Sequence, residues 1–125
     1  MSSHPSNNNL AKSFRAAFLG IILVIKNERN IRIQFLIAIL AIAAGILFKI
    51  SPVKWMIVLL LFAVVISAEI FNSALEKLAD MIEPNVNMTI RDIKDIAAGA
   101  VLWSAMVAVI VGLIIFVPEI LEFIE

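Results

Sequence analysis

The sequence contains no cysteine, a single histidine and four glycines, and only 16% of its 125 residues are charged. Without cysteine the chain cannot form disulfides, thiolate metal sites or a cysteine nucleophile. The lone His4 has no second histidine or cysteine with which to complete a metal site. The glycines form neither G-x-x-x-x-G-K-[ST] nor G-x-G-x-x-G. Any bound nucleotide must therefore be held without a glycine-rich loop.

Apolar residues, by contrast, are unusually abundant. They make up 62% of the chain, whereas a soluble domain is typically about 45–50% apolar. A chain of this length has too little interior to bury that much apolar surface away from water. The composition therefore predicts an integral membrane protein with one domain. Ten basic residues balance ten acidic residues, so net charge gives no reason to expect a nucleic acid partner, and we expect none.

The N-terminal quarter of the chain combines a polar tail with an amphipathic segment. Residues 1–9 are polar and carry no basic residue ahead of an apolar core, so we expect a disordered tail and no signal peptide. Residues 10–26 place apolar side chains at helical spacing, interspersed with Lys12, Arg15 and Lys26. This pattern is typical of a helix that lies in the membrane interface with its basic residues near lipid headgroups.

Three further apolar segments are long enough to span a bilayer as helices at about 1.5 Å per residue. Ser51-Pro52 separates the first two segments, and Pro118 closes the third. The second segment continues beyond its apolar run as an amphipathic helix. The predicted spans are residues 33–50, 54–82 and 90–117. Together with the surface helix they predict an all-α membrane fold, with a single domain over residues 10–125.

Basic residues are distributed unevenly between the ends of these spans. Eight of the ten lysines and arginines lie before the first span or between the second and third, and only Lys49 and Lys54 lie in the opposite loop. Loops rich in lysine and arginine stay on the cytoplasmic side of a membrane. The distribution therefore predicts a cytoplasmic N-terminus and a C-terminus on the outer side.

A row of polar side chains interrupts the second span. At about 100° per residue, Glu69, Asn72, Glu76 and Asp80 fall within roughly 80° of one another on one helix face, and Ser73 joins them. An acidic side chain at mid-membrane costs about 2.5–3.5 kcal/mol on insertion scales, and like charges at these spacings repel each other. Groups elsewhere in the chain must offset this cost.

The groups that can do so lie at the same side of the predicted membrane. They are the basic Arg29, Arg32, Arg91 and Lys94, accompanied by the acidic Glu28 and Asp95. Two interpretations remain open. One is a network of salt bridges and solvated helix ends. The other is a site for a divalent cation and phosphate, in which carboxylates hold Mg²⁺, basic residues neutralise phosphate charge, and a carboxylate at the hydrocarbon border acts as a general base.

Three blocks of sequence resemble those of a known family. Residues 27–32 (NERNIR), 68–76 (AEIFNSALE) and 94–101 (KDIAAGAV) are similar to the prokaryotic diacylglycerol kinase and undecaprenol kinase family. The resemblance extends from about residue 12 to residue 117, and the spacing between the blocks is preserved. It implies a membrane-embedded lipid kinase of the bacterial cytoplasmic membrane that uses ATP and Mg²⁺, assembles as a homotrimer and is unrelated in fold to soluble kinases.

The resemblance also implies roles for individual residues. Glu69 would take the proton from the lipid hydroxyl, and Glu28 and Glu76 would hold the metal ions that bridge the ATP phosphates. The residues that would contact or support the nucleotide are Glu28, Asn72, Glu76, Asp80, Asn87, Lys94 and Asp95. Those that would contact the lipid are Arg32, Gln34, Glu69 and Ala98.

The chain departs from the diacylglycerol kinase branch at three positions. Gln34 replaces a typically acidic residue, Asn9 replaces an arginine, and Asn87 replaces a histidine in the turn before the third span. The basic residues available to replace the missing arginine are Lys12 and Arg15. The Glu-Arg-Asn run at 28–30 looks more like the undecaprenol kinase branch. The expected acceptor is thus undecaprenol or diacylglycerol, with a slight preference for undecaprenol.

The main alternative function is a small proton-coupled transporter subunit, in which a glutamate within the membrane carries the proton. It predicts an acidic residue near mid-membrane with few partners, whereas the acids here form a row at the cytoplasmic end and face basic residues. A pore-forming or scaffold protein is a third option, but it gives no reason for Lys94-Asp95 beside the acidic row. Lipid-dependent consumption of ATP separates the kinase from both.

Overall fold

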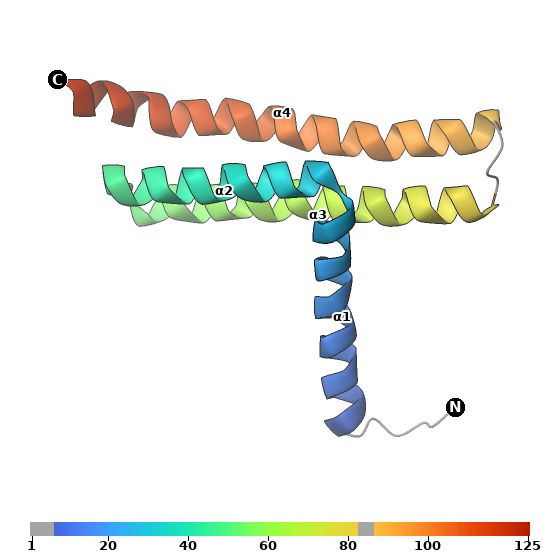
Figure 1. Cartoon of the computed structure of the whole chain (residues 1–125). Coiled ribbons are helices and arrows are strands. Elements are labelled where there is room, and N and C mark those ends of the chain that lie inside the picture. The colour runs from blue at the N-terminus through green and yellow to red at the C-terminus, as the bar shows by residue number, and fades with distance from the viewer. Residues whose placement is uncertain (1–6, 83–86) are drawn as a thin grey trace.

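The computed structural model describes residues 7–82 and 87–125, which form four helices and, within those ranges, no strand (Figure 1). The helices are α1 (Asn7–Asn27), α2 (Arg29–Phe48), α3 (Pro52–Ile82) and α4 (Met88–Ile124). The last three are long and apolar enough to cross a membrane. The all-helical fold with three candidate spans is confirmed. Residues 1–6 of the predicted tail and residues 83–86, between the predicted second and third spans, lie outside the described residues.

Three helices extend at least three residues beyond their predicted bounds. Helix α2 begins at Arg29, four residues before the predicted start of the first span. Residues 7–9, which we expected in the tail, belong to α1, where the Ser13 hydroxyl donates a hydrogen bond to the Asn9 carbonyl oxygen at 2.9 Å. Helix α4 does not end at Pro118 but continues to Ile124. A proline inside a helix removes one backbone hydrogen bond. Here the turn after the proline is held against α3, because Lys54 Nζ donates to Glu119 Oε1 at 2.6 Å.

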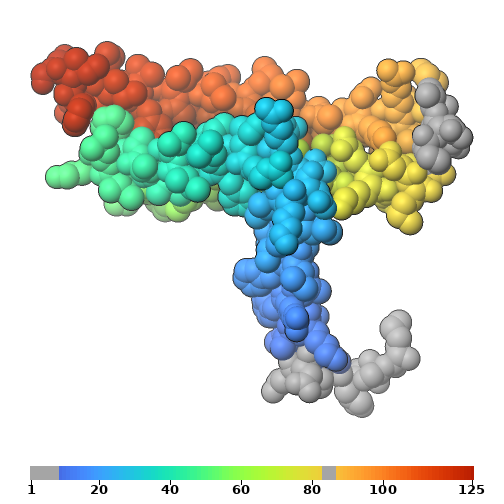
Figure 2. All heavy atoms as spheres, viewed as in Figure 1, coloured from blue at the N-terminus to red at the C-terminus, as the bar shows by residue number. Residues whose placement is uncertain are grey.

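Helices α2, α3 and α4 lie side by side with alternating directions, and α1 projects sideways from one end of α2 (Figure 1). The C-terminus lies at the end of the bundle where α2 turns into α3. Figure 2 shows α1, in blue, standing clear of the bundle, so that most of its surface is uncovered by the other helices. The sideways course of α1 is the arrangement that a helix on a membrane surface needs when its neighbours cross the membrane.

The hairpin between α2 and α3 depends on a helix ending of the Schellman type. Lys49 has a left-handed backbone conformation (φ 53°), and its N–H and that of Ile50 donate to the Ile46 and Gly45 carbonyl oxygens at 3.3 and 3.2 Å. The Trp55 ring packs directly on Gly45, where a Cβ atom would lie only 2.7 Å from the ring. This close approach fixes the relative position of α2 and α3.

The bundle has a thin core and a largely apolar surface. The buried cluster consists of Ile50, Val58 and Ile115, with aromatic side chains packed around it. Large apolar side chains on all four helices are exposed, such as Leu40 on α2, Leu60 on α3 and Ile114 on α4. A soluble protein cannot sustain so much exposed apolar surface. In a bilayer, however, lipid chains cover the surfaces that a protein core would otherwise cover.

Candidate active site

Glu69 is the first residue of the polar row, and its side chain meets α2. Its side chain is almost fully buried, with 3% of the residue exposed. In the described part of the chain its one hydrogen-bond partner is Gln34 of α2, whose Nε2 donates to Glu69 Oε2 at 3.3 Å. Burying a carboxylate beside a single neutral donor is unfavourable. A group retained under these conditions within a membrane helix is a candidate functional residue.

Three buried polar atoms lack hydrogen-bond partners among the described residues, one on Gln34, which contacts Glu69, and two on residues about one turn beyond Glu69 in α3. They are Gln34 Oε1, Asn72 Oδ1 and Ser73 Oγ. The first two are acceptors, and a serine hydroxyl can both donate and accept. Native proteins rarely leave such atoms unpaired, and a bound water, ion or ligand group is a common explanation where they do. The surroundings of Glu69 are therefore suited to a hydroxyl group or a hydrated cation.

Two further carboxylates act electrostatically on Glu69. Glu76 lies two turns further along α3, and Glu28 is the one residue between α1 and α2. Both are half-buried. The described residues contain no group of three or more histidine, cysteine, aspartate or glutamate side chains placed to hold a metal ion. Mg²⁺, however, binds through one or two carboxylates, water and substrate phosphates, and the oxygen donors of Glu28, Glu76 and Asn72 fit that requirement.

The exposed end of the row contains an ion pair between α3 and α4. Lys94 Nζ donates to Asp80 Oδ1, and the charge of Glu76 also acts on Lys94. The Asp80 side chain is 62% exposed and that of Lys94 is 35% exposed. An ion pair in water contributes little to stability, because solvent screens both charges. The Lys94 ammonium group therefore remains accessible to another anion, such as a phosphate.

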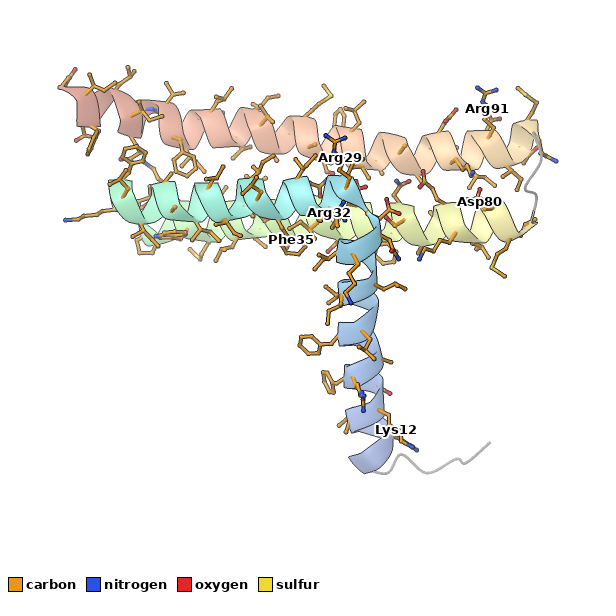
Figure 3. All side chains as sticks on the ribbon, in the orientation of Figure 1. Lys12, Arg29, Arg32, Phe35, Asp80 and Arg91 are labelled. Carbon is orange, nitrogen blue, oxygen red and sulfur yellow. The ribbon has the colours of Figure 1, made fainter. Side chains whose placement is uncertain are left out.

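The remaining predicted site residues are more dispersed. Arg32 donates to backbone carbonyl groups at the end of α1, and Asn87 accepts hydrogen bonds from the Thr89 and Ile90 N–H groups as the N-cap of α4. Asp95 and Ala98 are exposed on α4. Of the other basic residues considered, Arg91 points away from α3 and Lys12 lies near the distal end of α1 (Figure 3).

Sequence reasoning missed three features of this site. It placed Gln34 in a lipid pocket and did not pair it with Glu69. It counted Ser73 in the polar row but gave it no role, although its hydroxyl is buried and unpaired among the described residues. It also treated Arg32 only as a possible partner for acids or lipid. The available signal for Arg32 was its basic side chain just beyond the end of a predicted helix, where it can reach the last carbonyl groups.

Comparison with known proteins identifies the family. The model of the family "Prokaryotic diacylglycerol kinase" matches residues 15–116. The chain is 36% identical to the undecaprenol kinase of Bacillus subtilis (strain 168) over 112 residues, which cover 90% of this chain and 91% of the relative. It is 33% identical to the diacylglycerol kinase of Synechocystis sp. (strain ATCC 27184 / PCC 6803 / Kazusa) over 115 residues, covering 91% of this chain and 66% of the relative. No solved structure matches the chain.

The extent of these matches agrees with the molecule described above. The family match includes the first two candidate spans, residues 88–116 of the third and every residue of the polar row of α3. Together with the three apolar helices, they indicate an integral membrane protein. The chain belongs to the prokaryotic diacylglycerol kinase family, a family of lipid kinases.

Proposed function

We propose that this protein transfers the γ-phosphoryl group of ATP to the hydroxyl group of a membrane lipid, with Mg²⁺, at the cytoplasmic face of the membrane. Membership in a kinase family supports ATP as the co-substrate. The observation that carries the site assignment is the buried Glu69, hydrogen-bonded to Gln34, with unpartnered polar oxygens on Gln34 and, about one turn along α3, on Asn72 and Ser73. A carboxylate can take the proton of a hydroxyl group, and nearby acceptor oxygens can receive hydrogen bonds from it.

In this proposal Glu69 is the general base. Its carboxylate accepts the proton of the lipid hydroxyl while the lipid oxygen forms a bond to the γ-phosphorus, and the bond from that phosphorus to the bridging oxygen breaks to release ADP. The hydrogen bond from Gln34 Nε2 to Glu69 Oε2 orients the carboxylate. Burial excludes water from the same place, which disfavours transfer to water in place of lipid.

Glu28 and Glu76 are the residues that would hold Mg²⁺. Both interact electrostatically with Glu69, and Asn72 adds an oxygen acceptor without a partner among the described residues. Bound Mg²⁺ would neutralise negative charge on the phosphate oxygens. Without that positive charge, the carboxylates of α3 would repel an incoming triphosphate.

The nucleotide would lie at the exposed end of the row. Lys94 is accessible there and already faces the acidic side chains of Asp80 and Glu76. A phosphate oxygen can exchange with Asp80 as the partner of Lys94 at little cost, because the ion pair is exposed. Asp95 and Asn87 belong to the same end of α4 and complete the proposed nucleotide contacts.

The acceptor we propose is undecaprenol, with diacylglycerol as the alternative. Both lipids present a primary hydroxyl group at the membrane interface. Gln34, rather than an acidic residue, lies beside Glu69, and the run at 28–30 resembles the undecaprenol kinase branch. Ala98 is exposed on α4, where its small side chain leaves room for a lipid chain.

The proposed topology places the N-terminus in the cytoplasm, the C-terminus outside and α1 in the interface of the cytoplasmic leaflet. The uneven distribution of lysine and arginine supports this orientation. Exposed Leu10, Phe14 and Phe18 give α1 apolar side chains that can enter the lipid. We propose a homotrimer on the basis of the family resemblance.

The test is a kinase assay with the purified full chain in mixed micelles. Labelled ATP and Mg²⁺ are supplied with undecaprenol, with diacylglycerol or without added lipid, and labelled lipid product is separated from free phosphate. We expect transfer that depends on added lipid and is faster with undecaprenol. Faster transfer to diacylglycerol would reverse the acceptor assignment. Folded protein that transfers phosphate to neither lipid would refute the kinase proposal and favour the transporter alternative.

A further inference from the structure

The corner between α1 and α2 is bridged by the side chain of Arg32. Helix α1 ends at Asn27, and α2 begins two residues later at Arg29. Arg32 Nη1 donates to the Ile25 carbonyl oxygen at 2.9 Å and to the Lys26 carbonyl oxygen at 2.8 Å. Figure 3 shows Arg32 where the two helices meet. A side chain of α2 therefore provides the hydrogen-bond donor for two backbone carbonyl groups of α1.

These hydrogen bonds meet a general requirement of helix ends. The last four carbonyl groups of a helix have no partner within the helix. The Glu28 N–H donates to the Val24 carbonyl oxygen at 2.9 Å. Arg32 donates to the carbonyl oxygens of the next two residues of α1, Ile25 and Lys26. A guanidinium group is permanently charged, and its positive charge is favourable at the negative end of a helix dipole. Arg32 thus stabilises the end of α1 by both hydrogen bonding and charge.

The residue enclosed by this corner is Glu28. Its backbone is extended (φ −113°, ψ 114°), and its side chain makes no capping hydrogen bond. Its N–H donates to α1, and its carbonyl oxygen accepts from the Arg32 N–H at 3.4 Å. The position of the Glu28 carboxylate, whose charge acts on Glu69, consequently depends on the angle between the two helices.

We infer that Arg32 is a positioning residue, which locks the corner between α1 and α2 and thereby keeps the Glu28 carboxylate where its charge acts on Glu69. This role acts through Glu28 and differs from direct contact with the lipid headgroup, which the family resemblance implies for Arg32. The functional part of the inference rests on the proposed role of Glu28 in holding Mg²⁺. The structural part concerns only the helix corner and is tested without turnover.

Arg29 supplies a matched control. It lies three residues before Arg32 on the same helix, is exposed and carries the same charge. In the described ranges it makes no hydrogen bond or ion pair, whereas Arg32 makes two hydrogen bonds to α1. Arg29→Ala and Arg32→Ala remove the same charge near the same membrane surface. Arg32→Lys keeps the charge and one donor group but loses the rigid fork of the guanidinium.

The structural experiment measures the corner directly. Because the chain has no cysteine, spin labels can be attached at Ala16→Cys in α1 and Ala43→Cys in α2, both exposed positions. Labelled chains are diluted with unlabelled chains so that the measured distance lies within one chain. We expect a narrow distance distribution for the parent and for Arg29→Ala, a broad one for Arg32→Ala and an intermediate one for Arg32→Lys. A narrow, unshifted distribution for Arg32→Ala would overturn the inference.

The kinetic experiment separates positioning from lipid contact. Groups that orient a metal ligand typically change metal affinity by about 10–100-fold when they are removed. We expect Arg32→Ala to raise the Mg²⁺ concentration for half-maximal rate at least about tenfold, with little change in the KM for lipid. A higher lipid KM with unchanged Mg²⁺ dependence would assign Arg32 to lipid contact instead. If the parent protein showed no Mg²⁺ dependence, the proposed role of Glu28 in holding Mg²⁺ would be refuted. The spin-label distances would still show whether Arg32 fixes the angle between α1 and α2.

Discussion

Replacing Glu69 by glutamine is expected to change activity and stability in opposite directions. The substitution keeps the size of the side chain but removes its charge and its ability to accept a proton. A positioned general base contributes about 10²–10⁴-fold to the rate of a reaction. We therefore expect kcat to fall by about that factor in Glu69→Gln, with a nearly unchanged KM for Mg-ATP.

The stability effect follows from the surroundings of Glu69. Only 3% of the residue is exposed, its hydrogen bond to Gln34 is long at 3.3 Å, and the charges of Glu28 and Glu76 act on it. Burying an ion without an opposite charge costs several kcal/mol, whereas burying an amide without partners costs about 1–3 kcal/mol. We expect Glu69→Gln to raise the free energy of unfolding by about 1–2 kcal/mol, the modest difference between these two costs.

Both effects can be measured on the same preparations. Lipid-dependent kinase rates give kcat and KM, and thermal unfolding in the same micelles gives the midpoint temperature. Glu122→Gln is the control, because it makes the same chemical change at an exposed position near the C-terminus. A network of structural salt bridges makes the opposite prediction, since removing one charge would weaken the fold. A lower unfolding temperature with near-normal kcat in Glu69→Gln would refute the assignment of Glu69 as a base.

Three other substitutions test the metal site and the α2–α3 hairpin. Glu76→Gln should raise the Mg²⁺ concentration for half-maximal rate while lowering kcat less than Glu69→Gln does, as titration of the assay with Mg²⁺ would show. Gly45→Ala should lower stability by about 1–3 kcal/mol, because its Cβ would lie 2.7 Å from the Trp55 ring; thermal unfolding that is unchanged would contradict this. Lys49→Gly should raise stability by about 0.5–1 kcal/mol, because it relieves a left-handed backbone at φ 53°, and denaturation in micelles would detect the gain.

The spans and the polar row of α3 were predictable because each depends on local sequence. Apolar runs of sufficient length identify helices that cross a membrane, and helical periodicity alone placed Glu69, Glu76 and Asp80 on one face. The pairing of Gln34 with Glu69 depends instead on how two helices align. Gln34 lies 17 residues before Ser51 and Glu69 lies 18 residues after it. An antiparallel hairpin that turns at Ser51 therefore brings them to the same level, and this register was the signal that sequence reasoning left unused.

The pairing of basic with acidic residues could not be predicted from the sequence, because several side chains and backbone groups compete for the same partner. Sequence alone offered Arg29, Arg32, Arg91 and Lys94 as equivalent partners for the acidic row. In the structure Lys94 pairs with Asp80, whereas Arg32 donates hydrogen bonds to backbone carbonyl groups of α1. Arg91 points away from α3 (Figure 3). Which base meets which acid is decided by helix rotation and by backbone groups that no side-chain pattern reveals. The turn of α4 that follows Pro118 likewise makes a contact that is distant in sequence, between Lys54 and Glu119.

The polar row of α3 also explains how one helix can contact two reactants, one that dissolves in lipid and one that dissolves in water. Along α3 the row begins at Glu69, which is 3% exposed, and ends at Asp80, whose side chain is 62% exposed. Asp80 follows Glu69 by eleven residues, which is a rise of about 16.5 Å at 1.5 Å per residue. A lipid hydroxyl can approach the buried end from the membrane, while a water-soluble triphosphate can approach the exposed end beside Lys94. In the proposed reaction the rigidity of α3 therefore replaces a glycine-rich loop, because it fixes the distance between the base and the phosphate-binding end without any backbone rearrangement.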